Sequence, residues 1–292
     1  MNNADRTALI ATPIVLLIGA GLALAGSSGG AAVSGYPVYA LCVALAFLIQ
    51  VFAFVPAFLK QTEKYYDLTG SLTYLSVTGL ALGLAPAPDA RAYLLAALVA
   101  VWAVRLGSFL YSRIRAAGED RRFREIKPSF PRFLLTWLLQ GLWVSFSLAA
   151  ALAAITSARR VPLDAFAWVG LGIWLFGFSV EIIADRQKRA FSADPANKGQ
   201  FIRSGLWAWS RHPNYFGEIV LWLGIAIIAL PVLQGWGLVT LVSPVFVTLL
   251  LTRISGVPML EARADEKWGG QPDYEAYKAG TLVLVPRPPG RK

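Results

Sequence analysis

The chain has 292 residues, of which 56% are hydrophobic and only 15% are charged, whereas about a quarter of the residues in a soluble domain are charged. The composition therefore excludes an ordinary soluble domain and predicts an all-α integral membrane protein. In a membrane protein, a net charge of +10 is explained first by the basic residues that set its orientation in the membrane. We therefore expect no nucleic-acid partner.

Runs of about 18 or more apolar residues indicate transmembrane helices. Eight stretches qualify, and in chain order they are residues 8–26, 37–59, 68–85, 92–112, 133–155, 165–184, 215–231 and 236–256. With the N-terminus placed in the cytoplasm, 23 Lys and Arg residues fall on the inner side and three on the outer side, namely Arg91, Arg159 and Arg160. Inner loops carry the excess of basic residues, so we expect eight spans with both termini in the cytoplasm.

We expect residues 1–292 to form one membrane domain. With one histidine and one cysteine, Cys42, the chain has too few ligands for a zinc site, so we expect no metal. The glycines at positions 170, 172 and 177 lie inside an expected span, where close packing of helices is the better explanation for them.

Polar residues inside or beside the expected spans are candidates for function because burying them in a membrane is costly. Asp67 opens the third span, and Ser71 and Tyr74 follow it on the same helical face. An acid and a phenol on one face are able to hold and protonate a carbonyl, although Asp67 is equally suited to cap the helix. Arg105 lies in the fourth span, where it needs an anionic partner or reaches to the membrane edge.

The expected inner loops combine basic residues with acids, aromatic residues and an asparagine. Orientation and contact with anionic lipid headgroups both explain the basic residues, but neither explains the rest. Arginine side chains donate paired hydrogen bonds to phosphates, and carboxylates accept hydrogen bonds from ribose hydroxyls or an amine. The mixture therefore predicts a site for a phosphate-rich nucleotide.

Two motifs carry a resemblance to a known family. The segments "SGLWAWSRHPNYFGEIVLWLG" and "EARADEKWGGQPDYEAYKAGTLVLVPR" resemble the membrane steroid 5α-reductase family, most closely its bacterial branch, which is related to the sterol C14-reductases. The resemblance implies a seven-helix core over residues 60–292, with residues 1–36 as an additional N-terminal span. It also implies NADPH bound in a cavity open to the cytoplasm, and hydride transfer to a carbon–carbon double bond of a steroid, sterol or isoprenoid enone-like substrate. That lipophilic substrate would enter from the bilayer, and the protein would be a monomer in the bacterial inner membrane.

The resemblance places the cofactor region at about residues 181–286. Asn214 and Glu218 lie four residues apart near a helix start that Pro213 favours, and a helix N-terminus attracts phosphate. Matching the motifs position by position gives these cofactor residues: Arg113, Arg115, Glu181, Asp185, Lys188, Arg189, Arg203, Arg211, His212, Asn214, Glu218, Arg263, Asp265, Tyr274 and Tyr277. His212 is expected either to contact the cofactor or to brace its loop.

The family's substrate-gripping Glu and Tyr fall at Asp67 and Trp102, counted from the matched Arg105. An indole N–H donates a hydrogen bond but gives up no proton. Tyr74 is therefore a candidate to take the tyrosine's role, and the four residues together form the candidate catalytic group.

A second enzyme class shares part of the pattern. "RHPNY" and the later "E…WG…Y…Y" also resemble the isoprenylcysteine and phospholipid methyltransferases, which use S-adenosylmethionine. Those enzymes usually have adjacent glutamates, whereas Glu261 is followed here by Ala262. This departure and Asp67 favour the reductase. A transporter or structural membrane protein would explain Asp67 and Arg105 but not the polar loops.

Overall fold

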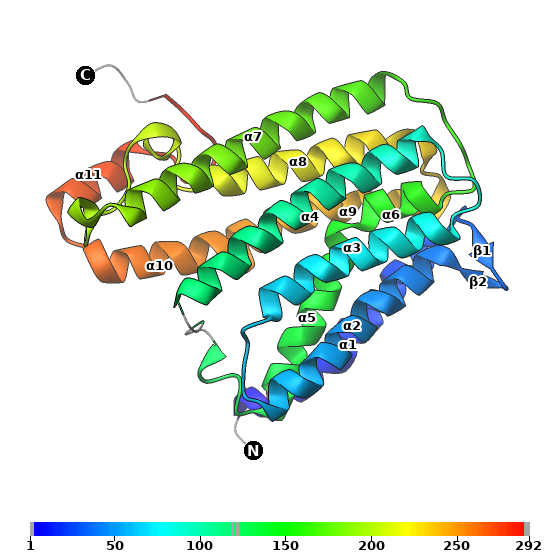
Figure 1. The fold of residues 1–292 in the computed structure, drawn as a ribbon, viewed down its shortest axis with the longest axis horizontal. Helices are drawn as coiled ribbons and strands as arrows, with labels where there is room; N and C mark the ends of the chain where they lie inside the picture. Colours follow the sequence, from blue (N-terminus) through cyan, green and yellow to red (C-terminus); the bar gives the residue numbers. More distant parts are fainter. Residues whose placement is uncertain (1–2, 118–119, 121–122, 289–292) are drawn as a thin grey trace. The chain divides into compact units, whose positions relative to one another are not determined.

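The computed structural model describes residues 3–117, 120 and 123–288, and the side chains of all of these except residues 113–117. The described chain is mainly helical, and its two short strands, Ala32–Val33 (β1) and Tyr36–Pro37 (β2), pair as an antiparallel hairpin (Figure 1). The prediction of an all-α membrane protein is thus confirmed.

Eleven α-helices form within the described residues. They are α1 (Asn3–Gly26), α2 (Val38–Leu59), α3 (Tyr66–Leu84), α4 (Ala90–Ala117), α5 (Phe130–Ser147), α6 (Ala149–Thr156), α7 (Ala165–Ala193), α8 (Pro213–Ala229), α9 (Val242–Leu249), α10 (Gly256–Trp268) and α11 (Pro272–Gly280). A 3₁₀ segment, Gly235–Leu241, precedes α9, and a π-helical segment, Leu250–Ile254, follows it.

Six helical segments of the described chain are long and apolar enough to cross a membrane, or seven if the bent pair of α5 and α6 is one span. The expected span at residues 68–85 forms α3, a 19-residue helix that is not among them. Multi-pass architecture is confirmed, while the count of eight spans and the cytoplasmic placement of the termini stay predictions.

The expected span over residues 133–155 is divided between α5 and α6, which meet at an angle of 58°. Two serine hydroxyls donate hydrogen bonds to backbone carbonyls of α5 near the bend. The Ser145 hydroxyl donates to the carbonyl of Gly141 at 2.8 Å, a bond that bends helices. The Ser243 hydroxyl donates to the Ser147 carbonyl at 2.6 Å and thereby satisfies an acceptor at the end of α5.

The chain divides into two compact units. Unit 1 comprises Met1–Ala167 and Ile228–Ser243, and unit 2 comprises Trp168–Ile227 and Pro244–Lys292. The candidate catalytic group belongs to unit 1, and the candidate cofactor residues from Glu181 onward belong to unit 2. The expectation of one membrane domain over the whole chain stays a prediction.

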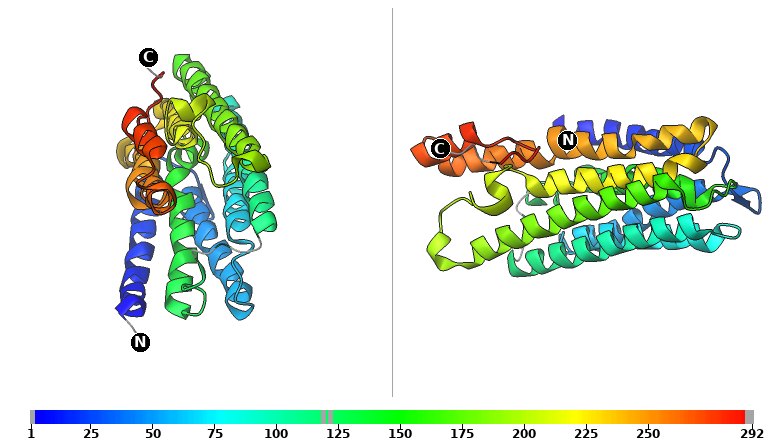
Figure 2. Two further views of the ribbon diagram at one scale, coloured as in Figure 1. Left: turned by 90° about the vertical axis from the view of Figure 1, so that its left-hand side faces the viewer. Right: turned by 90° about the horizontal axis from the view of Figure 1, so that it is seen from above.

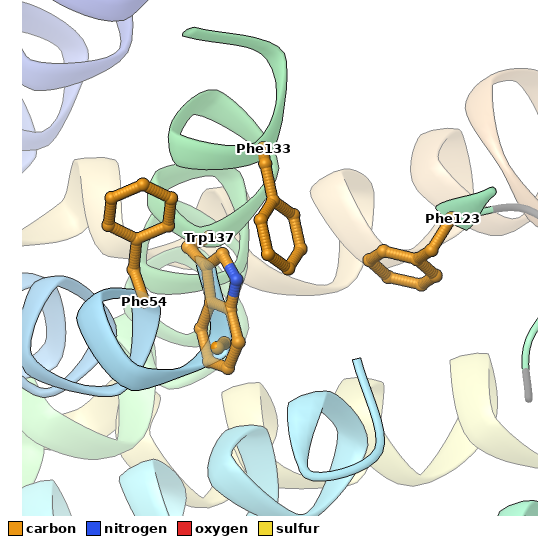
Figure 3. Packing of buried hydrophobic residues seen from close by; sticks show 5 residues of the cluster. Phe54, Phe123, Phe133 and Trp137 are labelled. Atoms are coloured by element: carbon orange, nitrogen blue, oxygen red, sulfur yellow. The ribbon is translucent and has the colours of Figure 1, made fainter. Parts of the chain in front are cut away.

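An aromatic cluster organises one end of unit 1 (Figure 3). Phe54 of α2 packs with Phe133 and Trp137 of α5, and Phe123, from the segment before α5, joins them. Beside this cluster the buried carboxylate of Glu63 accepts the amide of Asp120 at 2.8 Å and the ammonium of Lys127 at 2.5 Å. The segment that leads into α5 is thus anchored both by apolar burial and by a buried ion pair.

A buried arginine ties together another part of unit 1. The side chain of Arg91 is only 1% exposed. Its Nη1 donates to Ile228 O at 2.6 Å, and its Nη2 donates to Pro162 O at 2.8 Å and to Asp164 Oδ1 at 2.9 Å. Hydrogen bonding to this guanidinium holds the pKa of Asp164 below its usual range. A third carbonyl, that of Val161, accepts Nε at 3.3 Å.

Glycines bring α7 and α8 of unit 2 into backbone contact, and the two helices run side by side in Figures 1 and 2. A Cβ atom added at Gly217 would lie 2.5 Å from Gly177 O, and one added at Gly224 would lie 2.6 Å from Gly170 O. The packing role predicted for Gly177 is confirmed, and the carbonyl oxygen of Gly170 lies at the contact opposite Gly224. The predicted packing role is wrong for Gly172, where an added Cβ would meet nothing within 4 Å because that position faces away from α8.

Candidate active site

The loop before α8 is fastened by the segment that follows α11. The backbone amides of Arg211 and His212 donate to the carbonyls of Leu282 and Val283 at 2.9 and 3.1 Å. The Ser210 hydroxyl donates to Leu284 O at 2.8 Å, and α8 begins at Pro213, as its sequence predicts. The backbone of the loop is therefore held from two directions, by the helix and by the C-terminal segment.

One carboxylate grips two neighbouring side chains of this loop. His212 Nε2 lies 2.6 Å from Glu261 Oε1, and Arg211 Nη1 lies 3.1 Å from Glu261 Oε2. The His212 ring also stacks on Tyr215 with centroids 5.8 Å apart. The contact with Glu261 spans 49 residues of sequence and connects the loop to α10, while both roles expected for His212 stay predictions.

These residues lie on a cavity of about 360 Å³ within unit 2. Six of the predicted cofactor residues line it: Lys188, Arg211, His212, Arg263, Tyr274 and Tyr277. The wall also contains residues that the sequence did not single out as cofactor contacts, chiefly Phe201, Trp207, Glu261, Lys267 and Trp268. Four cations and one carboxylate therefore face a space that is walled largely by aromatic rings.

Phe201 lies at the centre of the aromatic wall. Its ring centroid is 5.8 Å from that of Trp268, 5.3 Å from that of Tyr274 and 5.4 Å from that of Tyr277. The Tyr277 hydroxyl donates to Trp207 O at 2.7 Å. Burial raises the pKa of both tyrosines well above the usual range, so both phenols remain protonated hydrogen-bond donors near neutral pH. The family resemblance named both tyrosines as cofactor contacts, and the cavity wall contains both of them.

A second polar group lies where α7 and α8 touch. Glu181 and Asp185 are 3% and 7% exposed. Asn214 Nδ2 donates to Asp185 Oδ1 at 3.1 Å, while Asn214 Oδ1 is buried with no hydrogen-bond partner among the described residues. A Cβ atom at Gly217 would lie 2.7 Å from the backbone nitrogen of Glu181, so the glycine contact is what brings these polar side chains together. Glu218 is half-buried on α8, one turn beyond Asn214.

Several predicted cofactor residues lie elsewhere. The side chain of Arg203 is 58% exposed and pairs with the 74% exposed Asp273 at 3.1 Å. Arg189 is exposed on α7, and Asp265 is exposed and bonds Tyr274 and Lys278 rather than lining the cavity. The side chains of two further predicted contacts lie outside the described residues, those of Arg113 and Arg115.

The candidate catalytic residues lie on the facing helices α3 and α4 of unit 1. The rings of Tyr74 and Trp102 meet edge to face, with centroids 5.0 Å apart, and both are buried. Asp67 is half-buried in the first turn of α3. The N-cap of this helix is Tyr65, which carries no side-chain capping bond; both roles expected for Asp67 stay predictions. Arg105 is half-buried, with its guanidinium 5.6 Å from the Phe109 ring centroid.

Comparison with known proteins identifies a family. Residues 53–281 match the family described as "Protein of unknown function (DUF1295)". The chain belongs to this family. It is also 27% identical over 169 residues to 3-oxo-5-alpha-steroid 4-dehydrogenase 1 of Rattus norvegicus. The aligned region covers 55% of this chain and 58% of that protein. The resemblance to the steroid 5α-reductase family is thus confirmed at the level of the family.

Two further relatives widen this comparison. An uncharacterized protein of Schizosaccharomyces pombe is 26% identical over 230 residues, covering 68% of this chain and 64% of the relative. The 3-oxo-5-alpha-steroid 4-dehydrogenase 1 of Mus musculus is 29% identical over 118 residues, 40% of each chain. The matches therefore span less than two thirds of the length of these relatives. No solved structure matches the chain.

Proposed function

We propose that this protein is an NADPH-dependent membrane reductase that reduces a carbon–carbon double bond of a lipophilic, steroid-like or isoprenoid substrate. The observation that carries the proposal is the cation-rich aromatic cavity of unit 2, in a chain related to 3-oxo-5-alpha-steroid 4-dehydrogenases. We extend the proposal to a monomer in a bacterial inner membrane that takes its substrate from the bilayer.

The residues of the cavity fit a phosphorylated nucleotide. Lys188, Arg211, Arg263 and Lys267 supply positive charge for phosphates, and Phe201 and Trp268 offer faces on which a base can stack. Its volume of about 360 Å³ is at the small end of ligand pockets, which run from about 300 to 1,000 Å³, so it would hold part of the dinucleotide. NADPH supplies the hydride when bound.

The group in unit 1 supplies the chemistry expected at the substrate. A phenol such as that of Tyr74 and an acid such as Asp67 are able to hold and protonate a polarised carbonyl oxygen. The buried indole of Trp102 contributes a donor but no proton. We therefore assign substrate binding to Tyr74, Trp102 and Arg105 and the proton-handling role to Asp67, with Tyr74 as the second acid.

The methyltransferase alternative gains one observation. The "RHPNY" element meets Glu261 through Arg211 and His212, so the two motifs shared with that class are joined in space. However, S-adenosylmethionine carries a sulfonium, an ammonium and one carboxylate, so its net charge is positive and four cations would repel it. Because both oxygens of Glu261 are engaged, that carboxylate offers little compensation. The charge of the cavity favours NADPH.

Ligand-induced stabilisation separates the two classes. We expect NADPH to raise the melting temperature of the detergent-solubilised protein, because a ligand at 100 times its Kd stabilises the folded state by about 2.7 kcal/mol. NADH should stabilise less, since it lacks the 2′-phosphate, and S-adenosylmethionine should have no effect. Stabilisation by S-adenosylmethionine alone would replace the reductase with the methyltransferase.

Turnover tests the role of Asp67. Losing a positioned acid typically costs about a hundredfold to ten-thousandfold in rate, so Asp67→Asn should abolish most NADPH oxidation with a panel of steroid and polyprenyl enones. NADPH affinity should change little, because the candidate phosphate ligands belong to unit 2. Normal turnover by this variant would remove Asp67 from the mechanism and leave Tyr74 as the acid.

A further inference from the structure

A carboxylate on the wall of a cationic cavity needs an explanation. Glu261 lies on α10 with its side chain 20% exposed, and it holds Arg211 and His212, whose side chains are 12% and 6% exposed. If the cavity binds phosphate, as the proposed function requires, a negative charge on its wall opposes the ligand. Considered as charge alone, Glu261 should weaken the binding of the cofactor.

The unused donors beside Glu261 point to another role. Arg211 Nε and Nη1 and His212 Nδ1 are buried without a hydrogen-bond partner among the described residues, although Nη1 lies 3.1 Å from the carboxylate. A buried donor without a partner is costly, and the guanidinium N–H groups of Arg211, which lines the cavity, are what an oxyanion would satisfy. His212 Nδ1 is a further donor when the imidazole is protonated and an acceptor when Nε2 alone carries the proton. Glu261 therefore contacts both side chains but leaves Nε of Arg211 without an acceptor.

We propose that Glu261 is a positioning residue that holds Arg211 and His212 in the orientation needed to bind a phosphate group of the cofactor. A free arginine side chain has many rotamers, and ordering it before the ligand arrives removes that entropic cost from binding. The C-terminal segment fixes the backbone of the same two residues through Leu282 and Val283. Glu261 fixes their side chains, so the pair is restrained at both levels.

The direction in which NADPH affinity changes in Glu261→Gln distinguishes a positioning role from simple charge repulsion. Glu261→Gln keeps the size of the side chain and removes its charge. Positioning predicts that NADPH binding weakens by about tenfold, because an ordered bond to a charged partner is lost, whereas charge alone predicts tighter binding. The matched control is Glu266→Gln, which makes the same charge change at an exposed position of α10 that does not line the cavity.

A double-mutant cycle separates positioning from a general structural role. In an Arg211→Gln background, Glu261→Gln should cost less than about twofold in NADPH affinity, because the side chain that it positions is gone. A purely structural role would give the same loss in both backgrounds. If Glu261→Gln does not fold, Glu261→Asp serves instead, since it keeps the charge but shortens the reach, and positioning predicts weaker binding while charge alone predicts no change.

Isothermal titration of NADPH into the full-length wild type and each variant supplies these affinities. Absence of NADPH binding to the wild type would refute the proposed function itself. Binding by the wild type, with equal or tighter binding by Glu261→Gln, would refute the positioning role and leave the proposed function standing.

Discussion

Two buried arginines, one in each unit, are held in opposite ways. Arg91 in unit 1 is 1% exposed and places its guanidinium against three carbonyls and Asp164. Arg211 in unit 2 is 12% exposed, lines a cavity and has a single ion pair, made by Nη1, while its Nε has no hydrogen-bond partner among the described residues.

The difference separates a structural arginine from a binding arginine. Removing Arg91 would strand several buried acceptors within the protein itself, so its effect should be on stability. Removing Arg211 would strand one carboxylate that has a second partner in His212, so its effect should be on the ligand. The predictions below test this difference between the two arginines.

The largest effect is expected at Arg91. Arg91→Met keeps most of the apolar bulk but removes bonds from a charged donor, each of which contributes about 1.5–3 kcal/mol, so unfolding in detergent should become easier by about 3 kcal/mol or more. NADPH affinity, measured below the melting temperature, should be unchanged. A variant with wild-type stability would show that the bonds of Arg91 are replaceable and would refute its structural role.

Arg211 should show the reverse behaviour. Arg211→Gln is expected to weaken NADPH binding by about 10- to 100-fold, the equivalent of one hydrogen bond to a charged group, with little change in melting temperature. Arg203→Gln, at an exposed surface ion pair, is the matched control and should change affinity by less than about threefold. Equal losses for both variants would mean that long-range charge, rather than the cavity, binds the nucleotide.

The glycine contact between α7 and α8 should show an intermediate effect on stability. An added Cβ at Gly177 would lie 2.6 Å from Gly217 O and from Leu221 N, and backbone atoms cannot move aside cheaply. Gly177→Ala should therefore destabilise unit 2 by about 1–3 kcal/mol. Gly172→Ala, in open space on the same helix, should instead stabilise it by about 0.5–1 kcal/mol; equal melting temperatures would refute the backbone contact.

The smallest effect concerns pH and Asp164. Because bonding to Arg91 lowers the pKa of this carboxyl in the folded state, its stabilising contribution is present above the unfolded pKa and is lost as pH falls through the folded pKa. The melting temperature of the wild type should therefore fall more steeply between about pH 5 and 3 than the melting temperature of the Asp164→Asn variant, because the asparagine side chain does not titrate. Parallel curves would show that the ion pair adds nothing.

Much of the helical framework was predictable from the sequence, because membrane spans are long apolar runs. The bend between α5 and α6 was not, since it depends on hydroxyl bonds to carbonyls, including one from Ser243, which lies 96 residues beyond Ser147. Likewise Arg91 counted only as a basic residue of an outer loop. Its partners are mainly backbone carbonyls, which every residue has and which no motif reveals.

The candidate site was predictable where residues lie close together in sequence. His212, Asn214 and Glu218 stand out because they cluster at a helix start, and the tyrosines of α11 stand out by their spacing. Arg203 lies just before the same motif, but its side chain pairs with the exposed Asp273 instead of lining the cavity, and a 3₁₀ turn, Gly205–Ala208, lies between it and the loop. Glu261 as part of the cavity was missed, since its contact with His212 is long-range.

Photolabelling tests the central claim, that the cavity of unit 2 binds NADPH, most directly. The purified full-length protein would be irradiated with a photoreactive NADPH analogue, with and without excess NADPH, and the labelled peptides would be identified by mass spectrometry. We predict labelling, suppressed by NADPH but not by S-adenosylmethionine, within residues 188–212 or 260–277, which contain the cavity wall. NADPH-protected labelling confined to other segments, or protection by S-adenosylmethionine alone, would contradict the claim.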